Sequence, residues 1–354
     1  MRRSAFLPRL LLVALSGLST ACAAMGLTEL PASGDDGPVT VYYPSSAPEQ
    51  AITRGPRAVH FEAAPDGAPK GGNGRLIVIS HGSGGAPWVH ADLARRLVEA
   101  GYVVALPEHR RDNWRDDSDA GPDSWARRPA EVSHAIDAVA ADPRFAPLLA
   151  LDKVGVYGVS AGGHTALVLA GGRWSRAGFK AHCNADLAAD FAACVGLATE
   201  LTGSWLDGPR QWLAHTIIDS RFADPAPIAY TDPRVAAIAA AVPAAADFDM
   251  ASLAHPRVAL GLVTAGADRW LVPRFHSDRV LQACQGCELL VTLPDGGHGA
   301  ALSPLPPHLP GLLGHLLDDP PGFDRAAATQ RIDDAVTAFF DRHLPPASAR
   351  PAAN

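Results

Sequence analysis

The chain has 354 residues, 47% hydrophobic and 19% charged, so it can bury one large core or two modest ones. Its 33 glycines and 31 prolines follow no collagen-like period, which argues against a fibrous protein. The formal net charge of -7, with no basic run after the first ten residues, argues against a nucleic acid as partner.

Residues 1–22 have the pattern of an export signal. Three arginines precede the apolar run 10–15, which is too short to cross a bilayer as a stable helix, and small residues follow at 19–24. The segment 21–23 suits ordinary signal cleavage, while residues 19–22 resemble a bacterial lipoprotein box with Ser19 in place of the usual Leu. Both kinds of processing stay open. We expect an exported, periplasmic or secreted protein, with Cys22 as the candidate lipidation site and membrane attachment only through that lipid.

Short apolar runs then alternate with longer amphipathic stretches, which is typical of parallel strands joined by crossover helices. Strands are expected at 39–43, 58–62, 76–80, 103–106, 153–157, 235–241, 258–264 and 289–293. Helices are expected at 89–100, 124–140, 162–169, 273–283 and 326–342, where apolar residues recur at steps of three and four. The pattern predicts an α/β domain over residues 38–343, with a mostly parallel eight-stranded sheet and helices on both faces.

The interval 172–232 interrupts this alternation and is too long for an ordinary connection in a compact domain. It is predicted to be an inserted cap, with Trp205 and Trp212 as candidate apolar lining of a substrate site. The alternative, that these tryptophans only anchor the insertion to the body, stays open. The Pro- and Ala-rich residues 344–354 are expected to form a disordered tail.

Four cysteines follow Cys22, and an even number in an exported chain favours disulfides. Of the three available connectivities, proximity along the chain favours Cys183 with Cys194 and Cys284 with Cys287. A zinc site at the second pair is disfavoured because no other close pair of Cys or His stands near it. No metal site is therefore expected.

Residues 158–162, Gly-Val-Ser-Ala-Gly, match the pattern GxSxG between the apolar run 154–157 and the helical stretch 164–169. A tight turn from strand to helix strains the backbone of the central serine, and its flanking positions must be glycine to avoid clashes. The N-terminus of the helix then offers N–H groups to developing negative charge. Ser160 is therefore the predicted nucleophile.

A serine hydroxyl needs a base to take its proton and a third group to orient that base. When the serine lies on such a turn, the acid and then the histidine follow it along the chain. Asp268 comes just after the expected strand 258–264, at the sheet edge where catalytic groups collect, and is the candidate acid. Asp247 and Asp249, after the preceding strand, are the alternatives.

The candidate base is His298, which lies between glycines in the loop after the expected strand 289–293. His164 follows the serine turn on its helix and His81 precedes a glycine turn, so both are expected to be structural. The reaction also requires N–H groups that donate to the oxyanion of the transition state. We assign these to Ala161 and Ser83, with Gly84 as the second choice in the Gly-rich loop 80–85.

Three segments together carry a resemblance: Ser-His-Gly-Ser-Gly-Gly at 80–85, Pro-Glu-His-Arg at 107–110 and Gly-Val-Ser-Ala-Gly-Gly-His at 158–164. They resemble the bacterial dienelactone-hydrolase-like group of the α/β-hydrolase superfamily, which is related to platelet-activating-factor acetylhydrolases. The resemblance implies a serine carboxylic ester hydrolase that acts on a small-molecule or lipid ester, with no metal or organic cofactor.

The chain departs from those families at two places. True dienelactone hydrolases have Cys where Ser160 stands, and the acetylhydrolases take their acid after the sixth strand, where this chain has none before Asp247. Two other functions stay open: a peptidase or amidase with the same triad, and a catalytically silent binding protein.

Overall fold

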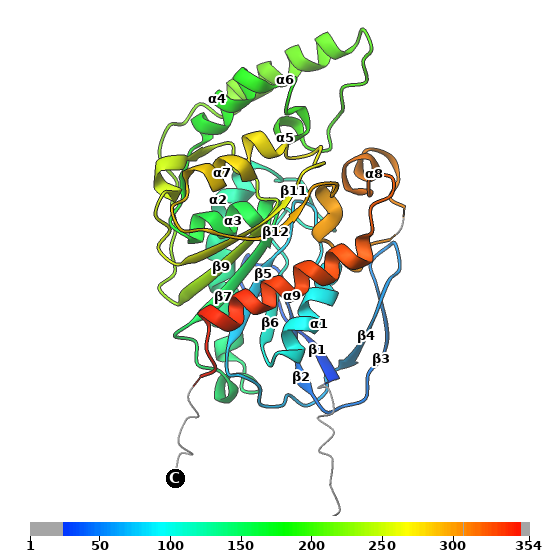
Figure 1. Ribbon diagram of the computed structural model, residues 1–354, viewed down its shortest axis with the longest axis vertical. Coiled ribbons are helices and arrows are strands. Elements are labelled where there is room, and N and C mark those ends of the chain that lie inside the picture. Colours follow the sequence, from blue (N-terminus) through cyan, green and yellow to red (C-terminus); the bar gives the residue numbers. More distant parts are fainter. Residues whose placement is uncertain (1–23, 307, 348–354) are drawn as a thin grey trace, which may run out of the picture.

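A computed structural model describes residues 24–306 and 308–347 (Figure 1). The predicted export signal with Cys22, and residues 348–354 of the predicted tail, lie outside this part of the chain. The predicted α/β architecture is confirmed: a central, mostly parallel sheet has helices on both faces. No helix among the described residues is long and apolar enough to cross a membrane.

Ten strands form the main sheet in the order β12-β11-β9-β7-β5-β6-β2-β1-β4-β3, so the predicted count of eight is too low. The first six of these are parallel to one another: β12 (Glu288–Leu293), β11 (Ala259–Ala265), β9 (Val235–Ala241), β7 (Val154–Val159), β5 (Leu76–Ser80) and β6 (Val103–Pro107). Every residue of β5, β6 and β7 is buried, which explains their continuous apolar runs. The carboxyl ends of the parallel strands therefore meet at one edge.

The other end of the sheet is largely antiparallel. β2 (Val39–Ser45) pairs antiparallel with β6 and β1 (Ala24–Leu30), and β3 (Gln50–Arg54) pairs antiparallel with β4 (Val59–Pro65). The two strands of this sheet that were not predicted are β1 and β3. β1 begins directly after the predicted signal, so the domain starts before residue 38, and β3 has only one buried residue and hence no apolar run.

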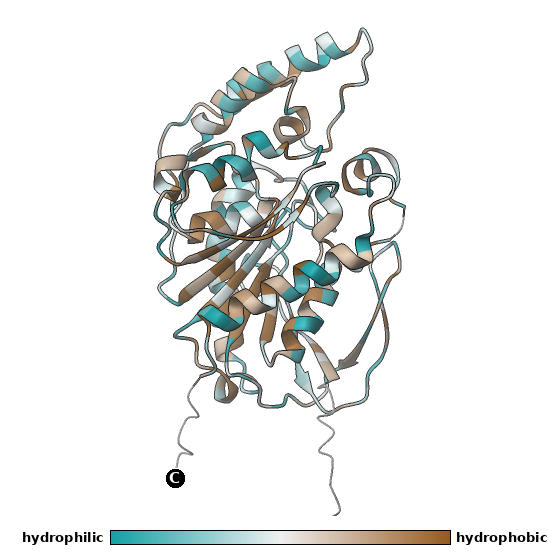
Figure 2. Cartoon of the chain, viewed as in Figure 1, coloured by the Kyte–Doolittle hydropathy of each residue, from teal (hydrophilic) through white to brown (hydrophobic). Residues whose placement is uncertain are grey.

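Two helix layers enclose the sheet (Figures 1 and 2). One apolar cluster includes residues of α2 (Pro122–Ala141), α3 (Ala161–Leu169) and α7 (Ser277–Ala283), and the other includes residues of α1 (Ala91–Glu99) and α9 (Arg325–His343). The predicted helix 273–283 is divided at His276, because a 3-10 turn (Pro273–Phe275) precedes α7. α8 (Gly311–Leu317) was not predicted.

The segment 172–232 contains α4 (Arg176–Asp186), α5 (Phe191–Val195) and α6 (Asp207–Arg221), and its strand β8 (Arg173–Trp174) pairs with β10 (Phe248–Asp249). We call this segment the insertion. Both predicted disulfide pairings are confirmed: Cys183 is bonded to Cys194 and Cys284 to Cys287. In Figure 1, α4 and α6 form the top of the molecule.

The prediction of a disordered tail is wrong for its first residues. Leu344 is fully buried, and the N–H of Ala347 donates to the carbonyl of Asn73 at 2.8 Å. The carbonyl of Pro345 accepts from Nε of Arg75 at 2.9 Å. Residues 344–347 therefore continue the packed body past the end of α9.

Candidate active site

Ser160 lies at the turn between β7 and α3, as predicted. Its φ of 59° and ψ of -118° are in a region that non-glycine residues rarely adopt. A Cβ on Gly158 would lie 2.0 Å from the carbonyl oxygen of Gly162, and a Cβ on Gly162 would lie 1.9 Å from that of Ser80. Only glycine fits at either position, so packing explains both glycines of the motif.

His298 and Asp268 lie at the carboxyl edge of the sheet and contact one another. Nδ1 of His298 is 2.7 Å from Oδ2 of Asp268, and both side chains are buried. Oδ1 of Asp268 accepts the N–H groups of Trp270 at 2.8 Å and Leu271 at 2.9 Å, which fixes the carboxylate. Because a carboxylate accepts, Nδ1 of His298 carries the proton and Nε2 is the basic nitrogen.

The two alternative acids have other partners. Oδ2 of Asp247 is 3.1 Å from Nε2 of His164, and this buried histidine is surrounded by Trp125, Trp174 and Phe248. Asp249 forms a half-exposed ion pair with Arg173. The contacts therefore favour Asp268 as the partner of His298.

Ser160 and His298 line the same pocket, which has a volume of about 180 Å³. Trp88, Trp114 and Trp270 form part of its wall, and the ring of Trp270 lies 5.1 Å from that of His298. Five leucines of the segment 302–317, which we call the lid, also line it: Leu302, Leu305, Leu309, Leu313 and Leu317. The pocket is therefore largely apolar around Ser160 and His298.

The structure corrects the prediction that Trp205 and Trp212 line this pocket. Their side chains are 83% and 69% exposed, and none of the residues that line the pocket comes from the insertion. The apolar cover comes from α8 and the loop before it. A sequence signal was present, because a stretch rich in Leu and Pro follows His298 directly, but a helix flanked by so many prolines has no clear periodicity.

The Gly-rich loop 82–85 also borders the pocket. The N–H of Gly84 donates to Oδ1 of Asp112 at 2.9 Å, and the N–H of Gly85 donates to the carbonyl of Gly82 at 3.0 Å. The N–H groups of Ser83 and Ala161 have no acceptor among the described residues. Of the two predicted candidates in this loop, the geometry thus favours Ser83 over Gly84 as a donor to substrate.

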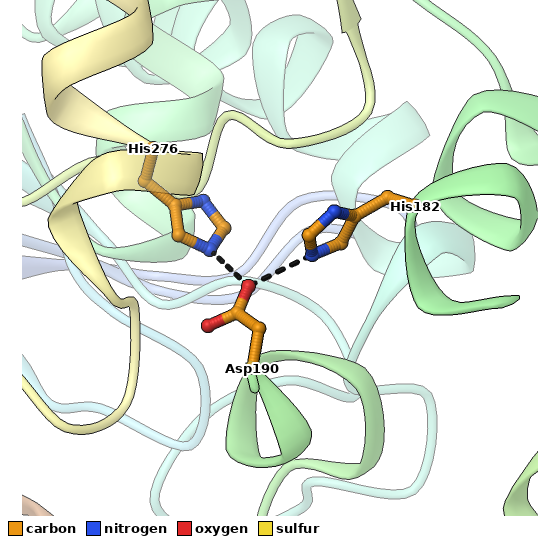
Figure 3. Close-up of side chains that lie close together, drawn as sticks. All are labelled: His182, Asp190 and His276. Carbon is orange, nitrogen blue, oxygen red and sulfur yellow. Dashed lines mark hydrogen bonds and ion pairs between the residues drawn. The ribbon is translucent and has the colours of Figure 1, made fainter. Parts of the chain in front are cut away.

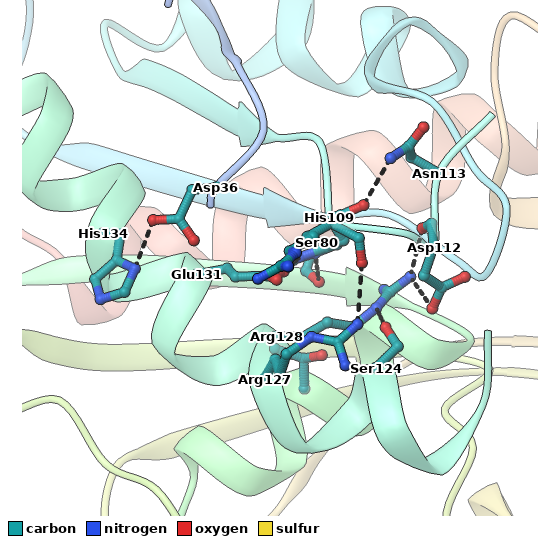
Figure 4. Close-up of polar contacts among 12 residues, drawn as sticks. Asp36, Ser80, His109, Asp112, Asn113, Ser124, Arg127, Arg128, Glu131 and His134 are labelled. Atoms are coloured by element: carbon teal, nitrogen blue, oxygen red, sulfur yellow. Dashed lines mark hydrogen bonds and ion pairs between the residues drawn. The ribbon is translucent and has the colours of Figure 1, made fainter. Parts of the chain in front are cut away.

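Buried polar residues contact this loop, and Figure 4 draws several of them, among them Asp112 and Arg128. His81 donates from Nδ1 to the carbonyl of Gly82, accepts the N–H of His109 at Nε2, and does not line the pocket. Burial lowers the pKa of His81 and His109 well below their usual range, so both are neutral. Burial acts to raise the pKa of Asp112, but Arg128 and hydrogen bonds from Ser124 and Gly84 lower it below its usual value.

One group of described residues has the spacing of a metal site: His182, Asp190 and His276, whose ligand atoms lie within 4.8 Å of one another (Figure 3). Nε2 of His182 and of His276 lie 2.8 Å and 2.9 Å from Oδ2 of Asp190. Nδ1 of His276 accepts the N–H of Ala245 at 2.9 Å, so the proton of the neutral ring is on Nε2. A protonated nitrogen cannot coordinate a metal ion, and the hydrogen bonds favour a clamp instead.

This clamp joins the insertion to the body. Oδ1 of Asp190 accepts the N–H of Val272 at 3.2 Å, just after Asp268 and its loop. Burial acts to raise the pKa of Asp190, but the hydrogen bonds from His182, His276 and Val272 lower it to about 2. Asp190 is therefore an ionised, buried acceptor at neutral pH.

Comparison with solved structures finds a similar chain, described as a ferulic acid esterase from Streptomyces cinnamoneus at 2.4 Å resolution. The two chains are 18% identical, with a TM-score of 0.57, and the similarity covers 95% of each. The chain has the α/β-hydrolase fold. No protein-family model matches it, and comparison with curated proteins finds no match. At this identity the α/β-hydrolase fold is what the similarity shows, and the narrower resemblance to dienelactone-hydrolase-like proteins stays a prediction.

Proposed function

We propose that the chain is an exported serine hydrolase that cleaves carboxylic esters through an acyl-enzyme intermediate. One observation carries the proposal: a strained serine and a histidine bonded to a buried carboxylate line one pocket at the carboxyl edge of the sheet. The α/β-hydrolase fold hosts many reactions, so the argument for this reaction comes from these residues. That the similar solved structure is described as an esterase supports it.

In the proposed mechanism, Nε2 of His298 takes the proton of Ser160 as Oγ attacks the ester carbonyl. Asp268 holds the ring through Nδ1 and stabilises the imidazolium that forms. The N–H groups of Ser83 and Ala161 stabilise the oxyanion. His298 returns the proton to the leaving alcohol, and then activates the water that releases the acid from Ser160.

The pocket suggests the kind of ester. Its wall of tryptophans and lid leucines favours an apolar acyl or aromatic group, because burying such a group contributes about 25 cal/mol per Å² of apolar surface. A volume of about 180 Å³ suits a small or medium-sized group. We therefore propose that the substrate is a small-molecule ester with an apolar acid part. We also propose that the protein is related to the dienelactone-hydrolase-like group.

Export is the second part of the proposal. It depends on the predicted signal at 1–22, and the disulfides Cys183–Cys194 and Cys284–Cys287 support it because such bonds persist in oxidising compartments. Mass spectrometry of the mature N-terminus tests this part and separates ordinary cleavage from lipidation at Cys22.

The test of the reaction is Ser160→Ala, assayed on nitrophenyl esters and by fluorophosphonate labelling. We expect loss of labelling and a fall in hydrolysis on the order of 10⁴-fold or more. Ser204→Ala, at an exposed serine of the insertion, is the matched control and should keep both. Activity retained by Ser160→Ala would overturn the assignment. Rates on ester and amide substrates with the same acyl group distinguish an esterase from a peptidase or amidase. A wild-type protein that fluorophosphonate does not label would instead support the alternative of a catalytically silent binding protein.

A further inference from the structure

Arg128 is a fully buried arginine on α2 that contacts the Gly-rich loop and does not line the pocket. Its guanidinium donates to the carbonyl oxygens of His81 and Gly82, the latter at 3.3 Å. It also donates to the carboxylate and the carbonyl of Asp112, at 2.8 Å and 3.2 Å, and from Nε to the hydroxyl of Ser124 at 3.0 Å (Figure 4). One side chain thus holds two consecutive peptide groups of the loop.

These bonds help to hold the loop carbonyls in place, together with Nδ1 of His81 and the N–H of Gly85, which donate to the same Gly82 oxygen at 2.7 Å and 3.0 Å. In a trans peptide, the C=O and the following N–H point in opposite directions. Because the carbonyl of Gly82 faces Arg128, the N–H of Ser83 faces away from it. Ser160 lies close to the loop there, since a Cβ on Gly82 would be 3.4 Å from Cβ of Ser160 and 3.8 Å from its Oγ. Gly82 and Ser83 both line the pocket.

Asp112 occupies the other donors of the loop. Its Oδ1 accepts the N–H of Gly84 at 2.9 Å, and its Oδ2 accepts the hydroxyl of Ser83 at 3.3 Å as well as Arg128. Asp112 and Arg128 have no solvent exposure, so this ion pair is satisfied entirely by the loop, by Ser124 and by one another. The N–H of Ser83 is left without an acceptor among the described residues.

We propose that Arg128, with Asp112, is a positioning residue that aims the Ser83 N–H at the oxyanion formed on Ser160. This inference rests on the proposed ester hydrolysis. The positioning role differs from a purely structural role in its effect. A buried ion pair can often be replaced with little loss of stability, whereas an N–H donor that no longer points at the oxyanion weakens binding of the transition state alone. Arg128 acts through the loop and touches no reacting atom.

The test is Arg128→Lys, which keeps the charge but cannot hold two carbonyls and a carboxylate in one plane. Arg127→Lys is the matched control. Arg127 is the neighbouring residue on α2, and it donates to the carbonyls of Asp123 and Arg110 and to the carboxylate of Asp119. Concentrations of active sites come from fluorophosphonate labelling to completion, so that misfolded protein does not count.

We expect Arg128→Lys to lower kcat by about 10²-fold, the usual effect of losing one oxyanion donor, with KM within about threefold. Affinity for a trifluoromethyl ketone, which forms an oxyanion with the serine, should fall by a similar factor. Affinity for the product acid should not fall. Arg127→Lys should keep both kcat and ketone affinity within about twofold.

An unchanged kcat per labelled site, or a fall in kcat with unchanged ketone affinity, would overturn the positioning role while leaving the proposed function intact. If the wild-type protein shows no Ser160-dependent ester hydrolysis, the proposed function fails and the positioning role fails with it. If Arg128→Lys does not fold, Asp112→Asn takes its place, because it keeps the acceptor for Gly84 and removes only the ionic partner. A folded Asp112→Asn protein with full kcat would also overturn the inference.

Discussion

The insertion (172–232) and the lid (302–317) differ in how they are attached and in what they contact. The Cys183–Cys194 disulfide links two parts of the insertion, and the buried clamp at Asp190 links the insertion to the body. The insertion nevertheless contributes no residue to the pocket that Ser160 and His298 line. The lid has no cysteine, but it supplies five leucines to that pocket. The two segments contact one another where Nδ1 of His315 lies 3.1 Å from Oε2 of Glu200.

This difference shows that length and tryptophan content are poor guides to which insertion covers a site. The insertion is the longer segment, but three of its large apolar residues, Trp205, Trp212 and Leu213, are mostly exposed, and its buried ones do not line the pocket. The lid is short, and its leucines lie over the pocket because it follows His298 directly. We therefore expect changes in the insertion to alter stability and changes in the lid to alter substrate preference.

The largest expected effect is on stability. Removing the disulfide with Cys183→Ser and Cys194→Ser should lower the free energy of unfolding by about 3 kcal/mol, since the bond closes a sequence separation of 11 residues. The control is Cys284→Ser with Cys287→Ser, whose separation of 3 residues predicts about 1.5 kcal/mol. Urea denaturation measures both. An equal or larger loss in the control would show that the insertion is not held by its disulfide.

Asp190→Asn should lower the free energy of unfolding by about 2 kcal/mol at neutral pH. The pKa of Asp190 is lowered to about 2 in the folded protein, from 3.8, so its stabilisation is complete above the higher value and is lost as the pH falls toward the lower one. The difference between the variant and the wild type should therefore shrink between pH 4 and pH 3.

Asp186→Asn is the control for this clamp, because that carboxylate lies 3.8 Å from His182 but is 40% exposed. Its effect should stay below about 0.5 kcal/mol at any pH. Denaturation midpoints at several pH values measure both variants, and a pH-independent loss in Asp190→Asn would contradict an ionised clamp.

Leu313→Trp in the lid should change substrate preference. The larger side chain fills part of the pocket, so kcat/KM for esters with long acyl chains should fall about tenfold relative to acetyl esters, which is about 1.4 kcal/mol. Leu213→Trp makes the same change in the insertion, at a side chain that is 52% exposed, and should leave the preference unchanged. A panel of nitrophenyl esters measures the ratio of kcat/KM for long-chain and acetyl esters in each variant. An equal change of this ratio in both variants would contradict the distinction between the lid and the insertion.

The smallest effect is expected from Trp205→Ala with Trp212→Ala. Because both side chains are mostly exposed and neither lines the pocket, kcat/KM should change by less than about twofold for every ester in the same panel. A fall in kcat/KM for esters of one acyl length only would show that these tryptophans contact the substrate.

Much of the fold and of the candidate site could be predicted because it depends on local patterns. The buried strands β5, β6 and β7 are continuous apolar runs, and the glycines beside Ser160 are required by backbone contacts within the turn and with the adjacent strand. β1 was hidden because its apolar residues adjoin those of the signal, and β3 because it is mostly exposed. The disulfide pairings followed from the short separations of their cysteines.

By itself, the sequence determined eight of the ten strands of the main sheet and the order of the main helices between them, the strained turn at Ser160, and the presence of an acid and a histidine at the ends of later strands. Only the tertiary structure decided that Asp268 rather than Asp247 meets His298, that Asp112 occupies the Gly84 N–H, and that the lid rather than the insertion covers the pocket. The physical reason is distance along the chain. Backbone geometry and apolar periodicity act over a few residues, whereas the two residues of each of these hydrogen bonds are 28 or more residues apart and meet only when the sheet and its helices pack.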